Sequence, residues 1–312
     1  MQDKTLLYTG LSYCPFLKWK EKRFLAETLE NLAALSRLSL NDLSLLLKRP
    51  LKTKLWKKGF IETAVQDGLK IIGTYGIKTV SVFDEAFPPQ LREIPDSPLM
   101  LFYRGSLPDP ERPSAAMVGT RRPTGEGIQT ALNLSKQFAE NGVPVISGLA
   151  YGIDTFSHRG CLEGGGKTVA VFACGVESIY PRTNKRLAAA ILESDGCIIS
   201  EYPPGTEPLQ FRFPERNRIV SGLSRSVIIV EAPEKSGALI TADFALEQGR
   251  DVCVYAGMQD SVQNTGCKKL AEDGAIPVEH AGDLLREWAN PTLQYLQREQ
   301  QIQLPLFEKG AR

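Results

Sequence analysis

Short apolar runs that alternate with amphipathic stretches constrain the fold of this 312-residue chain more than any other feature of its sequence. The runs cover residues 115–118, 143–146, 168–172, 197–199, 227–230 and 252–255. Between them, stretches such as 127–140, 186–193 and 238–248 have the length and pattern of helices. Short runs that are apolar throughout are typical of parallel strands buried on both faces. The pattern predicts an α/β domain, Rossmann-like and doubly wound, with a mostly parallel sheet over residues 113–283.

Residues 1–85 have a different pattern, in which leucines such as Leu25, Leu29 and Leu32 recur at helical spacing without a clear strand. They predict a small all-α, SAM-like domain. One stretch of it is rich in basic residues: Lys48, Arg49, Lys52, Lys54, Lys57 and Lys58. These side chains could contact phosphate, or they could form a solvated face whose lysines lie along apolar surface.

Two further segments complete the predicted domain order. Residues 86–112 are rich in proline and predict an irregular connector with one short strand near residues 99–103. Residues 284–312 predict a short, flexible tail. The expected order is therefore helical domain, connector, Rossmann-like domain and tail.

Composition limits the classes of function. No apolar run approaches the ~20 residues that span a bilayer, and the N-terminus lacks a signal-peptide pattern, so we expect a cytoplasmic protein without membrane contact. The six cysteines are scattered and the two histidines lie far apart, so we expect no metal ion. The net charge is only +1. Any polyanion must therefore be bound by a local patch.

The loop that follows the first apolar run, VGTRRPTGEG (118–127), predicts a phosphate site between a strand and a helix. An NAD site would also need an acidic residue at the end of the second strand to hold the ribose. That strand ends in Val145-Ile146-Ser147-Gly148, without a carboxylate. We therefore expect no dinucleotide cofactor, although a mononucleotide would still fit.

An enzymatic interpretation depends on a few titratable side chains. Asp154 and His158 lie four residues apart, the spacing of an oriented imidazole base on a helix. The structural alternative, that Asp154 caps the helix and His158 packs against the sheet, is favoured. Glu201 and Glu231 end two strands, and we expect them to order nearby basic side chains.

The loop after the fourth run contains Phe211-Arg212-Phe213-Pro214-Glu215-Arg216-Asn217-Arg218, in which aromatic and basic residues alternate. We expect it to be irregular. Aromatic faces stack unpaired bases while arginine and lysine follow phosphates, a combination that suits single strands. Alternatively, the phenyl rings plug the loop onto its domain and the arginines pair with Glu201 or Glu231.

Seven motifs in one order resemble the DNA-processing protein A family, also called Smf, over residues 80–280. They are GTRRPTGEG, SGLAYGIDTFSHRGCLEGGGKTVAV, YPRTNKRL, SEYPPG, FPERNRIVSGLS, EAPEKSGALITADFALEQGRDV and TGCKKLAEDGA. The resemblance implies an extended Rossmann domain that binds single-stranded DNA, forms homodimers and helps to load the RecA recombinase during natural transformation, without enzymatic activity. We expect the dimer contact at a sheet edge near residues 252–255.

The resemblance, together with the basic and polar residues of the same loops, gives a set of candidate DNA-binding residues. They are Gly119, Arg121, Arg122, Lys185, Gln210, Arg212, Phe213, Arg216, Asn217, Arg218, Lys235, Ser236 and Gly237. Many relatives have a basic residue where this chain has Gln210, and Arg212 is the candidate substitute. The alternative function is a Rossmann-type hydrolase of nucleotide derivatives that uses a glycine-arginine phosphate loop and a carboxylate such as Glu231.

The tail carries a motif of its own. Gln303, Leu304, Leu306 and Phe307 resemble the peptide that bacterial replication and repair proteins insert into the sliding clamp. Two apolar side chains would fill a pocket and Gln303 would hydrogen-bond at its rim. Alternatively, the tail folds back over a groove on its own domain.

Overall fold

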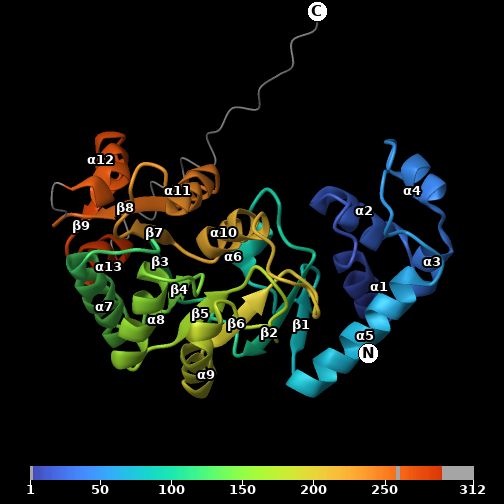
Figure 1. Ribbon diagram of the computed structural model, residues 1–312, viewed down its shortest axis with the longest axis horizontal. Helices are drawn as coiled ribbons and strands as arrows, with labels where there is room; N and C mark the ends of the chain where they lie inside the picture. Colours follow the sequence, from blue (N-terminus) through green and yellow to red (C-terminus); the bar gives the residue numbers. More distant parts are fainter. Residues whose placement is uncertain (1–2, 258–260, 290–312) are drawn as a thin grey trace, which may run out of the picture.

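The computed structural model describes residues 3–257 and 261–289. A cluster of five helices forms one end of the molecule, and a large sheet with helices on both faces forms the rest (Figure 1). The helices of the cluster are α1 (Asp3–Ser12), α2 (Trp19–Thr28), α3 (Leu32–Arg37), α4 (Leu40–Leu46) and α5 (Phe60–Tyr75). Polar side chains begin two of them: Asn31 accepts from Ala34 N, and Ser39 accepts from Asp42 N.

The sheet has nine strands in the order β1-β2-β6-β5-β4-β3-β7-β8-β9. They are β1 (Lys78–Ser81), β2 (Met100–Gly105), β3 (Ala115–Val118), β4 (Val145–Ser147), β5 (Thr168–Val171), β6 (Cys197–Ser200), β7 (Ser226–Ile229), β8 (Asp251–Tyr255) and β9 (Ile276–Val278). Strands β3 to β9 are parallel, whereas β2 pairs antiparallel with both β1 and β6. The prediction of a doubly wound, mostly parallel α/β sheet is confirmed.

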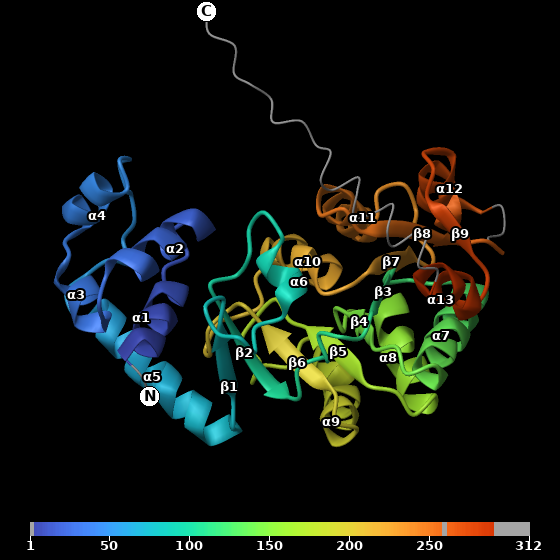
Figure 2. The same cartoon turned by 180° about the vertical axis from the view of Figure 1, so that it is seen from behind.

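Alternate residues of the strands face opposite layers of helices. Ala115, Met117 and Val145 face α7 (Gly125–Glu140), α8 (Ile153–Glu163) and α13 (Ala281–Ala289). Ala116 and Val118 face the other layer. That layer contains α10 (Arg212–Gly222), α11 (Gly237–Glu247) and α12 (Thr265–Glu272), while α9 (Lys185–Glu193) covers β5 and β6 on the first face. Figure 2 shows the same layers from behind.

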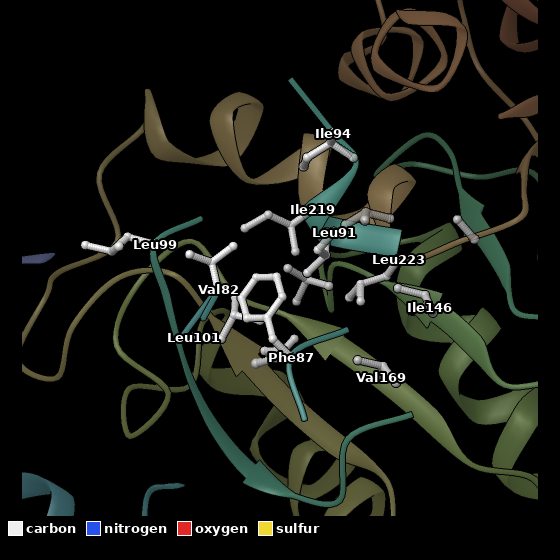
Figure 3. Close-up of a cluster of buried hydrophobic side chains, with 14 of the residues drawn as sticks. Val82, Phe87, Leu91, Ile94, Leu99, Leu101, Ile146, Val169, Ile219 and Leu223 are labelled. Atoms are coloured by element: carbon white, nitrogen blue, oxygen red, sulfur yellow. The ribbon is translucent and has the colours of Figure 1, made fainter. Parts of the chain in front are cut away.

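The segment that we expected to be a connector is part of the sheet and its core. Strand β1 falls inside the expected helical domain, and β2 lies between β1 and β6. Between them, Phe87 and Leu91 of the turn around α6 (Pro89–Arg92) are fully buried. Figure 3 shows this segment packed against Ile219 of α10, against Leu223 at the end of that helix, and against the strands below. The helical cluster therefore ends at α5, and residues 78–105 extend the sheet.

The other end of the sheet also differs from expectation. Helix α13 runs to Ala289, with Leu284 and Trp288 buried, so the folded domain continues past residue 283 into the expected tail. Strand β8 pairs with both β7 and β9, so residues 252–255 are not the sheet edge that we expected. The clamp-like residues Gln303, Leu304, Leu306 and Phe307 lie outside the described residues. None of the helices in the described ranges is long and apolar enough to cross a membrane.

Candidate functional site

An open groove of about 870 Å³ lies at the carboxyl edge of the sheet, where the loops after β3 and β7 meet the start of α10. Strand β3 is the point where the chain changes direction, since β4 lies on one side of it and β7 on the other. Parallel sheets bind ligands at such a switch point. The structure brings ten predicted residues to this groove: Gly119, Arg121, Arg122, Gln210, Phe213, Arg216, Asn217, Lys235, Ser236 and Gly237.

The carboxylate of Glu231 fixes the loop after β3. Glu231 is buried, and its two oxygens accept hydrogen bonds from the backbone N–H of Thr124 at 3.0 and 3.2 Å and from the Thr124 hydroxyl at 3.0 Å. Thr124 in turn caps α7 by accepting from Gly127 N. Glu231 therefore orders the backbone of the glycine-arginine loop, whereas we expected it to order basic side chains.

A tight contact with α8 holds the same loop from the other side. Ile153 N donates to Thr120 O at 3.2 Å. Gly152, with φ of 76°, approaches so closely that a Cβ there would lie 2.3 Å from Thr120 O. Only glycine fits this backbone geometry. Because both sides of the loop are fixed, the exposed Arg121 and Arg122 project from a rigid support.

An arginine and two aromatic rings form the centre of the groove. The Arg121 guanidinium lies over the Phe213 ring, 5.7 Å from its centroid. The Tyr180 ring lies 5.4 Å from the Phe213 ring and is 47% exposed. The arrangement offers a positive charge and aromatic surface side by side. Sequence reasoning missed Tyr180, although it begins the YPRTNKRL motif in the loop that follows the third apolar run.

Helix α10 replaces the irregular loop that we expected at residues 211–218. Pro214 is the third residue of the helix, where a missing N–H breaks no intrahelical bond. Arg216 points from this helix into the protein, where it is 3% exposed and donates to Gly148 O at 2.8 Å and to Val171 O. Burial lowers the pKa of Arg216. Arg216 therefore forms the floor of the groove rather than its exposed surface.

Three predicted residues lie away from the groove. Arg218 pairs with Glu201 at 2.6 Å and with Asp96 at 2.7 Å, and its side chain is only 8% exposed. The nearby Glu201 and Asp96 raise the pKa of Arg218. Arg212 lies over the Tyr202 ring at 5.2 Å, on the far side of the start of α10, and Lys185 is exposed at the start of α9. The structure thus shows the alternative in which Arg218 pairs with Glu201 instead of contacting DNA.

The fifth loop brings a lysine and a helix start to the groove. Lys235 and Gly237 are exposed. Ser236 caps α11 by accepting from Ala238 N at 3.3 Å, and Asn217 of α10 donates to Gly237 O at 3.4 Å. The groove thus has three exposed cations, Arg121, Arg122 and Lys235, next to the positive end of a helix.

Asp154 and His158 do not form a catalytic pair. His158 is fully buried, with Nδ1 2.7 Å from Thr168 Oγ1, and burial together with the charge of Arg216 lowers its pKa to about 3. The Asp154 carboxylate accepts from the backbone N–H groups of Gly148 and Ala150. Its pKa is raised by burial, against the opposing effect of Arg216. Within residues 3–257 and 261–289, no cluster of His, Cys, Asp or Glu side chains could hold a metal ion.

These features define a class: a Rossmann-like protein whose switch-point groove carries exposed cations and aromatic rings in place of a dinucleotide fingerprint. The chain belongs to the family described as DNA recombination-mediator protein A, whose model matches residues 78–289. The matched region begins with β1 and ends with the last residue of α13. The family predicted from the motifs is confirmed.

Individual relatives agree with this assignment. The chain is 43% identical to the DNA processing protein DprA of Streptococcus pneumoniae over 208 residues, which are 67% of this chain and 73% of the relative. It is 40% identical to DprA of Bacillus subtilis over 221 residues, 70% of this chain and 74% of that protein.

Two solved structures share the fold. The X-ray structure of DprA from Streptococcus pneumoniae matches with a TM-score of 0.73 and 33% identity, over 92% of this chain and 98% of that one. DNA processing protein A from Helicobacter pylori, described for its single-stranded DNA binding mode, matches with a TM-score of 0.61 and 29% identity, over 69% of this chain and 96% of that one.

Proposed function

We propose that this protein is a recombination mediator that binds single-stranded DNA in the switch-point groove. The placement of the Arg121 guanidinium over the Phe213 ring carries the proposal, because it presents a phosphate ligand and a stacking surface at one point. Lys235 and the start of α11 give the next phosphate contacts along the groove. The description of the Helicobacter pylori relative as a single-stranded DNA-binding protein supports this assignment.

The aromatic rings favour a single strand over a duplex. Phe213 is partly exposed and Tyr180 is 47% exposed, so both rings reach the surface where a base could contact them. Bases of a duplex are already stacked and paired, and would have to be extruded to reach these rings. Affinity for a duplex should therefore come from phosphate contacts alone.

The groove is poorly suited to the alternative, hydrolysis of a nucleotide derivative. Such chemistry needs a carboxylate free to act as base or nucleophile. Both oxygens of Glu231 are engaged by Thr124, and Asp154 is held by two backbone N–H groups. We infer that the protein is not an enzyme, in agreement with its family.

The remaining parts of the proposal follow from family membership. We propose that the bound strand is handed to a RecA-type recombinase in the cytoplasm, during natural transformation or recombination, and that the protein acts as a homodimer. Strand β8 is paired on both sides, so it cannot provide a free sheet edge for the second copy. We also propose that the motif from Gln303 to Phe307 binds a sliding clamp.

Fluorescence anisotropy with labelled oligonucleotides, single-stranded against double-stranded over a salt series, tests the proposal. We expect tighter binding of the single strand, and an affinity that falls with salt because cations are displaced from phosphates. Equal affinity for both forms, or Arg121→Ala binding as well as the parent, would contradict it. Release of phosphate or base from a nucleoside monophosphate would favour the hydrolase.

A further inference from the structure

The helical cluster carries a concentrated positive charge that the groove does not use. Residues 37–58 contain seven basic residues against one acidic residue, a net charge of +6, whereas the whole chain carries only +1. The basic residues are Arg37, Lys48, Arg49, Lys52, Lys54, Lys57 and Lys58. We call residues 37–58 the basic segment. The rest of the chain is therefore net acidic, and this segment stands out as a local patch of the kind that binds polyanions.

Most of these cations are free to contact a ligand. Only Arg49 is engaged, by Glu21 and by the carbonyl of Phe16. The other six are exposed, and none forms an ion pair with any residue that the structure describes. Arg37, Lys57 and Lys58 line a hollow of about 540 Å³ beside Trp56. One carboxylate, that of Glu62, also lines this hollow, so the cations outnumber the acidic side chains around it.

A cavity of about 610 Å³ lies next to both the basic segment and the 210–213 turn. It lies between the helical cluster and the sheet, with Leu55 of the basic segment on its wall and Phe211 and Arg212 opposite. The residues on either side of this pair, Gln210 and Phe213, line the groove. Residues 210–213 are thus a ridge shared by the groove and the cavity.

The elements that carry the two basic surfaces lie in the same half of the molecule. Figures 1 and 2 both show α4, and the chain that leads from it to α5, on the side where α10 and α11 lie. A strand that leaves the groove over the ridge would therefore run toward the end of the molecule that carries the basic segment.

The cavity wall repeats the cation and aromatic pairs of the groove. Phe211 is 57% exposed, with the Arg212 guanidinium 5.5 Å from its ring centroid, and Lys20 Nζ lies 5.4 Å from the Trp19 ring. Four acidic side chains, those of Asp96, Glu201, Glu207 and Glu215, also line the cavity, and two of them are ion-paired. Arg218 pairs with Glu201 and Asp96, and the Tyr202 hydroxyl donates to Glu215 at 2.9 Å.

We propose that a single strand held in the groove continues over the 210–213 ridge and across the cavity, and that its phosphates bind the lysines of the basic segment. This inference rests on the proposed function, since it extends the path of the same ligand. It makes the helical cluster a second part of one continuous binding surface, with Phe211 as a stacking point on the way.

Oligonucleotide length tests the path. The variant Lys52→Gln/Lys54→Gln/Lys57→Gln/Lys58→Gln is compared with the parent on single strands of about 6 and about 30 nucleotides, a short one that fills the groove and a long one that exceeds it. We expect unchanged affinity for the short strand and about tenfold weaker binding of the long one at low salt. For the long strand, the slope of log affinity against log salt concentration should become shallower by about 0.7 for each phosphate that the variant no longer neutralises.

A matched control removes the same charge elsewhere. Lys70→Gln/Lys136→Gln/Lys167→Gln/Lys269→Gln changes four exposed lysines outside the path, the first three of them paired with surface carboxylates. It should leave the dependence of long-strand affinity on salt as in the parent. Phe211→Ala should weaken long-strand binding, whereas Leu209→Ala, an exposed neighbour without an aromatic face, should not. Equal loss of affinity in both lysine variants, or no loss in either, overturns the inference.

The outcome separates this inference from the proposed function. If Arg121→Ala abolishes binding of both lengths while the basic-segment variant binds the long strand normally, only the extended path is wrong. If Arg121→Ala leaves both lengths unaffected, the groove is not the binding site and both proposals fail.

Discussion

Gly127 and the carboxylate of Glu231 are packed so closely that a Cβ at position 127 would lie 1.8 Å from Oε2. Gly127 is in the first turn of α7, and Glu231 lies two residues after the end of β7, so the contact joins the two sides of the switch point. Through Thr124, the same carboxylate fixes the loop that carries Arg121. The geometry of the groove therefore requires glycine at position 127, because any side chain there would displace the Glu231 carboxylate.

Gly127→Ala should displace the Glu231 carboxylate, lower the free energy of unfolding by about 2–4 kcal/mol and weaken single-strand binding. Gly125→Ala is the matched control, because nothing lies within 4 Å of a Cβ at that position of the same helix turn. It should be neutral or stabilise by about 0.5 kcal/mol. Urea denaturation measures the stability and fluorescence anisotropy measures the affinity. Similar values for the two variants would contradict the proposal that Glu231 fixes the loop.

Arg121→Ala should reduce the affinity for a short single strand by about 1.5–3 kcal/mol, since it removes a charge-assisted hydrogen bond to phosphate. The control is Arg159→Ala on α8. This arginine is also exposed and also lies over a ring, that of Phe156 at 5.5 Å, but outside the groove. An equal effect of the two substitutions would mean that only overall charge matters.

Phe213→Ala should weaken single-strand binding by about 1–3 kcal/mol because base stacking is removed, while Phe213→Tyr retains most of the affinity. The duplex should bind Phe213→Ala almost as well as the parent, because its bases do not reach the ring. Anisotropy with both forms of DNA at one salt concentration checks this. Parallel loss of affinity for both forms would point to a general disturbance of α10.

Arg218→Met should destabilise the fold far more than it affects the DNA site. Glu201 and Asp96 would be left without their cation, at a cost of about 3 kcal/mol, the lower end for a buried pair because Asp96 is partly exposed. Arg212→Met, on the same helix but not ion-paired to a carboxylate in the described chain, is the control. Denaturation curves measure the change in stability, and affinity is compared at a temperature where both variants are folded.

His158 should make stability dependent on pH. Its pKa falls from 6.5 to about 3 on folding, so below pH 6.5 the unfolded chain takes up a proton that the folded protein does not. The free energy of unfolding should therefore decrease as pH falls, and this residue should account for about 2 kcal/mol between pH 7.5 and 5. His158→Asn should abolish that part of the dependence, whereas His280→Asn, at the exposed histidine, should retain it.

The strands that the sequence predicted are those buried on both faces. Runs such as 115–118 and 227–230 are apolar throughout, and this pattern is recognisable without a structure. Strands β1 (KTVS) and β9 (IPV) lie at the two edges of the sheet, where half-exposed polar residues and a proline are tolerated. These short sequences mix polar and apolar residues, so the pattern does not distinguish them from loops.

The candidate site was predictable in part, for a similar reason. The rule that parallel strands end at one edge brings Arg121, Phe213 and Lys235 together from residues far apart in sequence. The role of Arg218 depends on Asp96, which lies 122 residues away, and no local pattern indicates that contact. The alternation of aromatic and basic residues at 211–218 suggested an irregular loop, but these residues begin α10, with Pro214 in its first turn.

Only two residues, Gly76 and Ile77, separate the end of α5 from the beginning of β1. The helical cluster is therefore held on a very short tether, and β1 is hydrogen-bonded into the sheet. If the strand binds both surfaces, the second contact forms within one molecule, at an effective concentration on the order of millimolar for a short linker. Two individually weak contacts would then give high avidity for long strands and little for short ones. The affinity of the protein would therefore depend on the length of the single strand.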